Sequence, residues 1–438
     1  MNGPSKRASL HTLGCRLNQS ETNIIRGKLE AAGYEIVPFG EVADFGVINT
    51  CTVTREADAK SRKAVRSFIR KNPDAFVAVI GCYSQMDAAA IAEIQGVDLI
   101  VGNQEKLNVL DYAVQGKNST PLIVRDRIER DDFTIETNGL GSPSCRANLK
   151  IQDGCDFMCS FCVIPFARGR ARSRRIGNLL DEARQLVKNG AKELVLTGVN
   201  IGTYAFEDYT LLDVIDRLNE IEGMARIRIS SIEPTTIPMG LLERMADPAH
   251  ALVPHLHIPL QSGSDRVLER MRRRYTRAEF LNFVETAAAR VPDTGIGTDI
   301  MAGMPGESDA DFEDTCALLT DGPIDYTHVF KFSEREGTAA ARMSDRIHPG
   351  TVDRRAARVR QISAEKLRAF HARHAGHTHE VLFEQREGEY WTGYTENYIR
   401  VAVRSDDILE NQICPVVIEE SKGEFVLAEL AGEFAVAS

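Results

Sequence analysis

The sequence lacks several features, and each absence excludes a class of protein. It contains no run of about 18 apolar residues, so no membrane-spanning helix and no membrane partner are expected. Its first ten residues lack the apolar core of a secretory signal, which favours a cytoplasmic protein. The nine cysteines among 438 residues are few and odd in number. This argues against a disulfide scaffold and favours reduced thiols that hold a metal.

The chain also lacks the positive net charge of a typical nucleic-acid-binding protein, because its net charge is −10. The acidity is local, since residues 376–438 carry thirteen acidic and four basic side chains. Upstream, 49 basic and 50 acidic residues nearly balance, and basic residues cluster at 60–71, 168–175 and 266–277. Each cluster is either a solvated helix face or a surface for a polyanion.

The first part of the chain alternates short apolar runs with helical spacing, which predicts a parallel sheet with crossover helices. Strands are expected at 9–15, 45–51 and 76–82, and a helix at 55–72. Each predicted strand ends on a cysteine, namely Cys15, Cys51 and Cys82. Because the carboxyl ends of parallel strands share one edge, the three thiols should converge there. The alternative is that they are three small buried apolar residues.

The second part again alternates strands and helices over more than 200 residues, which predicts a barrel or part of one. Strands are expected at 192–198, 226–231, 255–260, 295–301 and 326–332, and helices at 178–190, 277–291 and 352–375. Five short strands between 379 and 430 predict a small antiparallel barrel. The chain is too long for one core. It is therefore predicted to be an α/β protein with domains at 1–128, 141–372 and 376–438.

A dense cysteine motif lies at 151–175, which reads IQDGCDFMCSFCVIPFARGRARSRR. Cys155, Cys159 and Cys162 can chelate one centre from a single loop. Structural zinc needs four ligands, and no fourth cysteine or histidine lies nearby in the sequence. Three thiolates on a cubane iron–sulfur cluster leave one iron open to a substrate or cofactor.

This CxxxCxxC motif, with Phe161 before its last cysteine, resembles the signature of the radical S-adenosylmethionine enzymes. Together with the three upstream cysteines and the terminal barrel, the chain resembles the methylthiotransferases over nearly its whole length. The resemblance implies an amino-terminal methylthiotransferase domain, a radical domain and a TRAM domain. It also implies two [4Fe-4S] clusters, one on Cys155, Cys159 and Cys162, and an auxiliary one on Cys15, Cys51 and Cys82.

The resemblance implies a reaction that replaces the hydrogen on carbon 2 of an adenine with a methylthio group. Carbon 2 of adenine carries a hydrogen that is not usefully acidic, so general bases would achieve little. In the family, S-adenosylmethionine on the open iron gives a 5′-deoxyadenosyl radical that abstracts this hydrogen. Sulfur comes from the auxiliary cluster, and a second S-adenosylmethionine supplies the methyl group. An electron donor and a source of sulfur are implied as further partners.

Several segments are most similar to the branch that modifies N6-threonylcarbamoyladenosine at position 37 of tRNA, next to the anticodon. They are LGCRLNQSET, NTCTVTREADAKSR, DGCDFMCSFCVIPFARGRARSR, SSIEPTTI, HLHIPLQSGSDRVLERMRRRYT and FSEREGTAAA. The implied enzyme is the tRNA (N6-L-threonylcarbamoyladenosine(37)-C(2))-methylthiotransferase. Alternatives are the branches acting on isopentenyladenosine or on a ribosomal protein aspartate, and a non-catalytic iron–sulfur protein that binds RNA. DNA is not an expected partner.

Residues around S-adenosylmethionine are assigned from the same resemblance. They are Phe161, Gly198, Asn200, Gly202, Gln261, Ser262, Gly263, Asp299, Gly303 and Gly306. Glycine lets backbone groups approach a ligand closely. Each of these glycines is equally compatible with a plain turn.

Two groups of residues are candidates for RNA contacts. Arg168, Arg170 and Arg172 follow the cysteine loop, and arginine pairs in bidentate fashion with carboxylates. We hypothesise that one of the three reads the carboxylate of the threonylcarbamoyl group; helix-face solvation or salt bridging is the alternative. In the tail, Tyr394, Tyr398 and Arg400 are candidates for stacking on bases, although aromatic side chains also fill barrel cores. The remaining cysteines, Cys316 and Cys414, are expected to be structural, whereas the role of Cys145 is left open.

Overall fold

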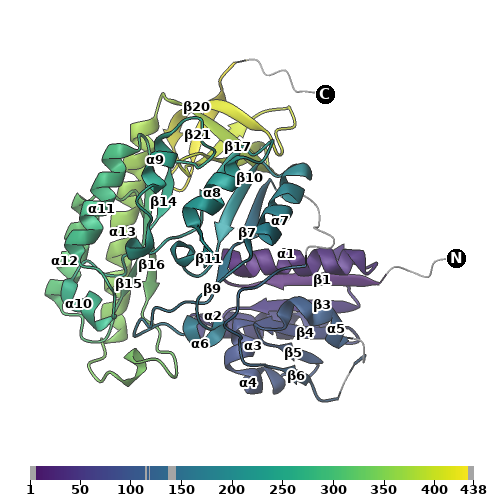
Figure 1. Ribbon diagram of the computed structural model, residues 1–438. Coiled ribbons are helices and arrows are strands. Elements are labelled where there is room, and N and C mark those ends of the chain that lie inside the picture. Colours follow the sequence, from purple (N-terminus) through teal and green to yellow (C-terminus); the bar gives the residue numbers. More distant parts are fainter. Residues whose placement is uncertain (1–5, 114–115, 118, 137–144, 433–438) are drawn as a thin grey trace.

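The computed structural model describes residues 6–113, 116–117, 119–136 and 145–432. Figure 1 shows a parallel sheet at the amino terminus, a central unit of strands and helices, and a small barrel near the carboxyl terminus. In the described part of the chain, no helix is both long and apolar enough to span a membrane. The boundaries 1–128, 141–372 and 376–438 stay predictions, and residues 137–144 lie outside the described part.

The amino-terminal unit is a six-stranded parallel sheet in the order β2-β1-β3-β4-β5-β6. Its strands are β1 (Arg7–Thr12), β2 (Glu35–Val37), β3 (Phe45–Thr50), β4 (Phe76–Gly81), β5 (Leu99–Val101) and β6 (Leu122–Val124). Its helices are α1 (Arg16–Ala31), α2 (Arg55–Lys71), α3 (Cys82–Met86), α4 (Ala88–Ala92), η1 (Lys106–Asn108) and α5 (Val109–Tyr112). The three predicted strands and the predicted helix at 55–72 are therefore present.

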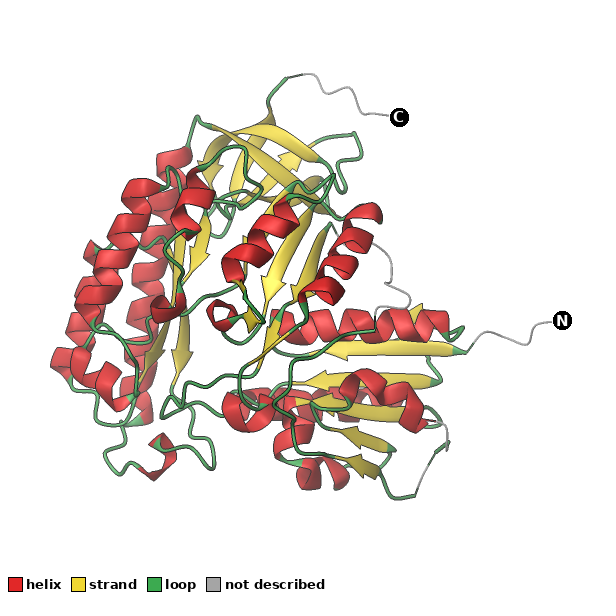
Figure 2. Ribbon diagram, in the orientation of Figure 1, coloured by secondary structure: helices red, strands yellow, loops and turns green. Residues whose placement is uncertain are grey.

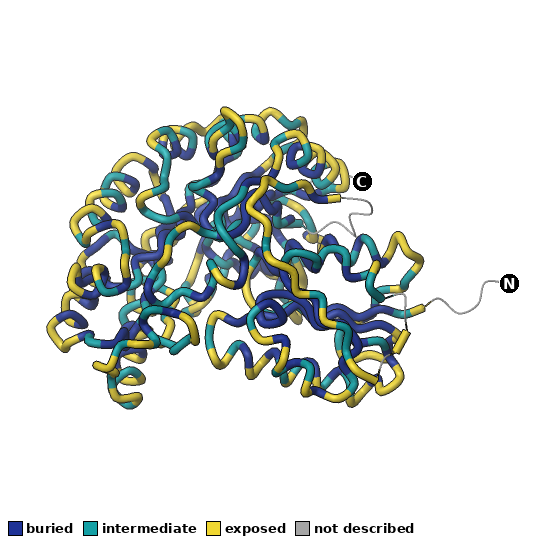
Figure 3. The backbone as a smooth tube through the Cα atoms, turned by 60° about the horizontal axis from the view of Figure 1, so that its bottom comes forward, coloured by how far each residue is buried: buried dark blue, intermediate teal, exposed yellow. Residues whose placement is uncertain are grey.

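Apolar side chains cover both faces of this sheet. Neighbouring residues of β3 point in opposite directions, so that Val47 packs with Leu29 of α1 and Ile48 packs with Phe68 of α2. All six residues of β3 are buried, as Figure 3 shows for the central strands. The Thr54 hydroxyl caps α2 by accepting a hydrogen bond from the amide of Ala57 at 3.1 Å. This cap begins the helix directly after the loop that carries Cys51.

The central unit is an incomplete barrel made of two three-stranded parallel sheets. One sheet has the order β13-β10-β7 and the other β14-β15-β16, and a bridge between Ile227 and Leu252 extends the first toward the second. The strands are β7 (Arg146–Lys150), β10 (Glu193–Thr197), β13 (Arg226–Ile229), β14 (His255–His257), β15 (Gly295–Ala302) and β16 (Tyr326–Lys331). All five strands predicted here are found, and β7 is an additional one.

Helices cover the outer face of this barrel, as Figure 2 shows. They are α7 (Ile176–Lys188), α8 (Leu211–Asn219), α9 (Leu241–Ala246), α10 (Asp265–Arg270), α11 (Arg277–Arg290), α12 (Asp309–Asp321) and α13 (Pro349–His374). The shorter elements are β8 (Gln152–Asp153), α6 (Ile164–Arg168), β9 (Arg172–Ser173), η3 (Ile201–Thr203), β11 (Ala205–Phe206), β12 (Tyr209–Thr210), η4 (Pro234–Thr236) and η5 (Ala340–Arg342). Helix α1 of the first unit contacts β7 at the open side of the barrel.

The terminal unit is a closed barrel in the order β17-β18-β19-β21-β20. Its strands are β17 (Thr378–Glu387), β18 (Tyr390–Thr395), β19 (Arg400–Arg404), β20 (Ile413–Ser421) and β21 (Val426–Leu430). The predicted small barrel is confirmed, with one difference: β19 and β21 pair in parallel, whereas the other neighbours are antiparallel. Trp391 and Cys414 lie in its apolar core, and Cys316 is buried on α12.

Buried histidines join the carboxyl end of α13 to the terminal barrel. The His371 ring lies 2.9 Å from the hydroxyl of Ser421 on β20, and His374 lies 3.0 Å from His379 on β17. Burial lowers the pKa of His371 and of His374 to about 4. Both rings are therefore neutral in the folded protein at neutral pH.

We expect the free energy of unfolding to fall as the pH drops from about 6.5 to about 4, because only the unfolded chain binds protons at these histidines in that range. Replacing His371 with Gln removes one of these groups and should make the decrease shallower. Urea denaturation across this pH range measures the effect, and the exposed His377→Gln variant serves as the control. Identical pH dependence of His371→Gln and wild type would contradict the prediction.

Candidate functional site

The cysteine loop follows β8, near the carboxyl end of β7, a strand that was not predicted from the sequence. Its backbone is fixed by hydrogen bonds, including those from the Cys155 amide to the Gly169 carbonyl at 3.1 Å and from the Ser160 amide to the Met271 carbonyl at 2.9 Å. Gly154 has a φ of 70°, and a Cβ there would lie 2.0 Å from the carbonyl oxygen of Arg170. A side chain at this position would therefore push the cysteine loop away from the backbone at Arg170.

The thiols of this loop are half-buried and receive hydrogen bonds from nearby donors. The amide of Phe157 lies 3.3 Å from Sγ of Cys155, and the guanidinium of Arg273 lies 3.3 Å from Sγ of Cys159. Burial, and then the neighbouring Cys159, raises the pKa of the Cys162 thiol to about 12. Thiolates at this site therefore need a cationic partner. Arg273 was visible in the sequence as part of a basic cluster but was not predicted as a site residue.

The second group of cysteines lies at the carboxyl edge of the amino-terminal sheet. Cys15 follows β1, Cys51 follows β3, and Cys82 begins α3 directly after β4. Burial raises the pKa of the Cys51 thiol to about 11, and the nearby Cys82 and Cys15 contribute to the increase. The side-chain amide of Asn103 lies 3.5 Å from Sγ of Cys82. The structure thus brings these three thiols into electrostatic range of one another.

A buried ion network links the two cysteine groups. The Arg168 guanidinium donates to Glu21 and to Asp153, both at 3.0 Å. Lys150 lies 2.8 Å from Glu21 and 2.6 Å from Asp153, and Lys106 also donates to Glu21. Each of these side chains is at most 6% exposed. We call these five residues the interface ion network, because Glu21 and Lys106 belong to the first unit and the other three to the barrel.

Fixed charges dominate this network. Burial by itself would raise the pKa of Glu21, but Arg168 and then Lys106 and Lys150 hold it well below its usual value. Burial likewise opposes the charge of Arg168, yet Cys82 and then Glu21 raise the pKa of this side chain. Arg168 therefore stays charged beside the second cysteine group. Its burial argues against the predicted contact of Arg168 with RNA.

Arg170 and Arg172, the other two arginines predicted to contact RNA, differ in how far they are exposed. Arg172 is 8% exposed and lies 3.7 Å from Asp153, so it too is turned away from an RNA surface. Arg170 is 42% exposed and lies 3.9 Å from Asp156, which leaves it accessible to a ligand. The alternative of salt bridging thus describes Arg168 and Arg172, and only Arg170 of the three predicted residues stays a candidate for RNA.

The tail aromatics lie where the terminal barrel meets the other two units. The Tyr398 hydroxyl accepts a hydrogen bond from Arg16 at 2.6 Å, and its ring lies 4.5 Å from that of His255. Tyr394 stacks on Tyr398 at 4.8 Å. Arg400 pairs with Glu387 at 2.8 Å. Because the two rings pack on protein groups, this interface argues against their predicted stacking on RNA bases.

The residues predicted around S-adenosylmethionine lie on β15 or on loops after the barrel strands. Gly198, Asn200 and Gly202 follow β10; Gln261, Ser262 and Gly263 follow β14; Asp299 is on β15, and Gly303 and Gly306 follow it. Phe161 packs with apolar residues beside the cysteine loop. Two of the glycines serve internal packing, since a Cβ would lie 2.3 Å from Thr236 at Gly202 and 2.6 Å from Thr315 at Gly263. The alternative reading of these glycines therefore has support.

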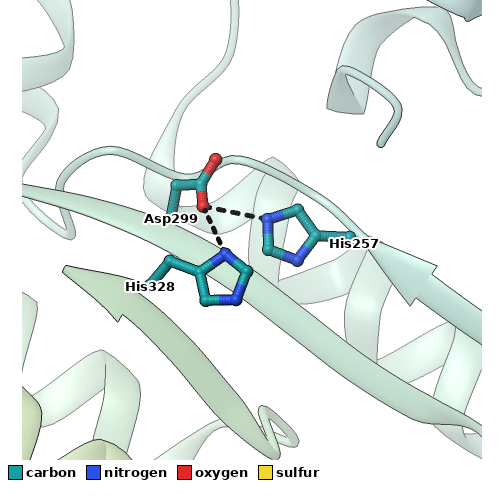
Figure 4. Close-up of side chains that lie close together, drawn as sticks. All are labelled: His257, Asp299 and His328. Carbon is teal, nitrogen blue, oxygen red and sulfur yellow. Dashed lines mark hydrogen bonds and ion pairs between the residues drawn. The ribbon is translucent and has the colours of Figure 1, made fainter. Parts of the chain in front are cut away.

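Asp299 sits inside the barrel between two histidines, as Figure 4 shows. Its carboxylate lies 2.9 Å from Nε2 of His257 and 3.4 Å from Nδ1 of His328. Burial alone would raise the pKa of Asp299, but the hydrogen bonds from His257 and His328 lower it. His257 was not predicted as a site residue, and here it hydrogen-bonds with Asp299. His328 was missed, although its alternation with Tyr326 along the predicted strand placed it on the same face.

These groups fit the cofactors that the sequence implies. Each cysteine group offers three free thiols, so a [4Fe-4S] cluster held by either group would keep one iron for a ligand from outside the chain. Hydrogen-bond donors and buried cations beside both groups suit an anionic iron–sulfur cluster. The side-chain nitrogen of the buried Asn200 has no hydrogen-bond partner among the described residues, as expected for a group that meets a polar cofactor.

The chain matches two described families. Residues 149–319 match the Radical SAM superfamily, and residues 7–102 match the uncharacterized protein family UPF0004. A threonylcarbamoyladenosine tRNA methylthiotransferase of Bacillus subtilis is 37% identical, over 95% of this chain and 96% of its own length. A tRNA-2-methylthio-N(6)-dimethylallyladenosine synthase of Geobacillus thermodenitrificans is 32% identical, over 98% and 84%.

A solved structure supports the fold independently. The radical S-adenosylmethionine methyltransferase TsrM from Kitasatospora setae superposes with a TM-score of 0.53 at 15% identity. The match covers 74% of this chain and 73% of that one. At this identity the likeness concerns the fold alone, and it agrees with the arrangement of parallel strands described above.

Removal of Arg168 should destabilise the junction of the first two units. In Arg168→Met, Glu21 and Asp153 each lose a buried cationic partner, which typically costs about 3–5 kcal/mol. Urea denaturation measures the free energy of unfolding. The control is Arg184→Met, whose exposed pair with Asp181 should contribute less than about 1 kcal/mol. Equal stability of the two variants would contradict the role of the network.

Proposed function

The chain belongs to the radical S-adenosylmethionine methylthiotransferases, and from this premise we propose that it converts N6-threonylcarbamoyladenosine in tRNA to its 2-methylthio derivative. The observation that carries the proposal is the 37% identity with the Bacillus subtilis enzyme along nearly the whole of both chains. The dimethylallyladenosine synthases are related at 32% identity. Their substrate is therefore the reference against which the proposal is tested.

The first cysteine group is assigned to the cluster that binds S-adenosylmethionine. Cys155, Cys159 and Cys162 would hold a [4Fe-4S] cluster, and the Arg273 guanidinium would keep its hydrogen bond to Sγ of Cys159. Most of the residues assigned to S-adenosylmethionine lie on β15 or on the loops after β10, β14 and β15, and the side-chain nitrogen of Asn200 has no partner in the described part of the chain. When bound, the two cofactors supply the one-electron chemistry that removes the hydrogen from carbon 2 of the adenine.

The second cysteine group is assigned to an auxiliary [4Fe-4S] cluster that supplies sulfur. Cys15, Cys51 and Cys82 would hold it at the edge of the first sheet, with the Asn103 amide directed at Sγ of Cys82. The interface ion network fixes this edge against the loop of the first cluster. The chain's own residues would thus hold the sulfur-supplying group and the hydrogen-abstracting group at one junction between the two units.

Three partners complete the proposal. The tRNA is the substrate, and Arg170, exposed beside the cysteine loop, is a candidate for contacting its backbone. An electron donor reduces the first cluster, and a source of sulfur restores the second.

The reaction is tested directly by mass spectrometry of nucleosides. Anaerobically reconstituted protein is incubated with threonylcarbamoylated tRNA, S-adenosylmethionine, a reductant and sulfide. The expected product is 2-methylthio-N6-threonylcarbamoyladenosine. Preferential modification of tRNA that carries isopentenyladenosine would replace the proposed substrate with the alternative one.

The two cysteine groups should be separable by mutation. Cys155→Ser should abolish formation of both 5′-deoxyadenosine and the methylthio product, because it removes a ligand of the cluster that binds the cofactor. Cys51→Ser should still form 5′-deoxyadenosine. The rate of methylthio product formation should fall more than about 100-fold, because loss of a ligand should cost more than loss of a group that only supports one. Cys145→Ser is the control and should behave as wild type. Normal product formation by Cys51→Ser would remove the auxiliary group from the reaction.

A further inference from the structure

A cavity of about 570 Å³ opens beside the second cysteine group. Gly14 and Cys51 line it from the first sheet, and Phe330 and Lys331 line it from β16 of the barrel. Its walls therefore come from the carboxyl ends of parallel strands in two different units. These ends are where ligands bind in both open parallel sheets and barrels.

The walls are held in place by contacts between the units. The Arg335 guanidinium, from the loop after β16, donates to Asp58 and to Thr52 of the first unit, both at 2.6 Å. The amide of Arg55 donates to the hydroxyl of Ser333 at 3.0 Å. The cavity is therefore framed by specific bonds across the junction.

Apolar side chains in this cavity are unusually accessible. Phe330 is 44% exposed and Val53 is 46% exposed, and both are lining residues. An exposed aromatic ring in the lining of a cavity is a stacking surface for an unpaired base. Phe330 lies on a strand, so its position is fixed by the sheet.

The charges at the cavity suit a nucleic acid backbone. Lys60, Lys331 and Arg360 line it, against one carboxylate, Glu56. Lys60 pairs with Glu56 at 2.8 Å and Lys331 pairs with Asp353 at 2.6 Å, but both pairs are exposed and therefore weak. Arg360 forms no ion pair or side-chain hydrogen bond within the described part of the chain. Arg360 is thus available to a phosphate, and Lys60 and Lys331 can exchange their weak exposed pairs for contacts with phosphates.

A second cavity provides a contrast. It has a volume of about 590 Å³ and lies between α7 and α8, where Lys188 and Arg217 are among its lining residues. It touches neither cysteine group, and it lies beside the amino-terminal end of β10. Positive charge and size alone therefore do not distinguish the cavity beside Cys51. Its position and the exposed ring of Phe330 in its lining do.

We propose that the cavity beside Cys51 receives an unstacked nucleotide of the anticodon loop, with the base on Phe330 and flanking phosphates on Lys60, Lys331 and Arg360. This inference rests on the proposed tRNA substrate. It names the surface that holds the loop next to the group that supplies sulfur. Tyr394 and Tyr398 pack on protein groups where the terminal barrel meets the other units. The proposal therefore assigns base stacking to the accessible ring of Phe330 in their place.

The test measures binding of an anticodon stem-loop RNA that carries N6-threonylcarbamoyladenosine to the cluster-loaded protein by fluorescence anisotropy. Phe330→Leu, which keeps an apolar side chain but loses the ring, should raise Kd about tenfold. Phe330→Tyr keeps the ring and should restore binding. Iron content and the thermal unfolding midpoint establish that each variant is folded and loaded.

The phosphate contacts are tested by salt dependence. Lys331→Gln and Arg360→Gln should each weaken binding and reduce the slope of log K against log salt concentration by about 0.7, the value for one phosphate of a single strand. Lys188→Gln, which removes a cation from the other cavity, is the matched control and should change neither quantity. A similar loss of RNA affinity in Lys188→Gln would show that the effect depends only on the overall charge of the protein, and it would overturn the proposal.

Three outcomes would overturn this inference or the proposed function, and they can be told apart. If wild type forms the methylthio product and Phe330→Leu, Lys331→Gln and Arg360→Gln bind RNA unchanged, the cavity assignment is wrong and the function stands. If the variants bind RNA normally but accept electrons slowly from a flavoprotein donor, the cavity is a donor-docking surface and the proposal is overturned. If wild type forms no product on threonylcarbamoylated tRNA, the proposed function fails, whatever the variants bind.

Discussion

The interface ion network is the interaction on which the site depends. Arg168, Lys150 and Asp153 come from the barrel, and Glu21 and Lys106 come from the first unit. A buried charge is tolerated when it is paired and hydrogen-bonded, so the five side chains stabilise one relative position of the two units. Three cations face two carboxylates, and the excess positive charge lies beside Cys82. The same contacts that join the units therefore also favour an anionic group at the second cysteine site.

Parallel strands explain why so many functional groups meet at this junction. A parallel sheet directs all its carboxyl ends to one edge, and here the edge of the amino-terminal sheet faces the corresponding end of the barrel. Cys15, Cys51 and Cys82 are brought together in this way, although 36 and 31 residues separate them along the chain. The cavity lined by Phe330 occupies the same junction, because β16 ends there. Helix α1, which begins directly after Cys15, contacts β7 at the open side of the barrel.

The arginines and aromatics show where reasoning from sequence alone was incomplete. In the sequence, Arg168 and Arg172 look like part of a basic surface for RNA. In the structure, Arg168 pairs with Glu21 and Asp153, and Arg172 lies near Asp153, so both side chains are buried in the protein. Tyr398 looks like a base-stacking residue of the terminal barrel, but Arg16 and His255 hold it at an interface between units. The sequence shows the type of a side chain and the element that carries it. Which partner it meets depends on how separate units pack.

The sequence by itself determined the class of fold, the three cysteines of the loop and the three strand-ending cysteines of the first sheet. These follow from local rules, since hydrophobic periodicity specifies strands and helices, and a short loop necessarily keeps its own cysteines together. Only the tertiary structure decided the partners of Arg168, the contact between Arg273 and Cys159, and the cavity beside Cys51. Each of these joins residues from different elements or units. Their proximity is a property of packing, which no local pattern of residues encodes.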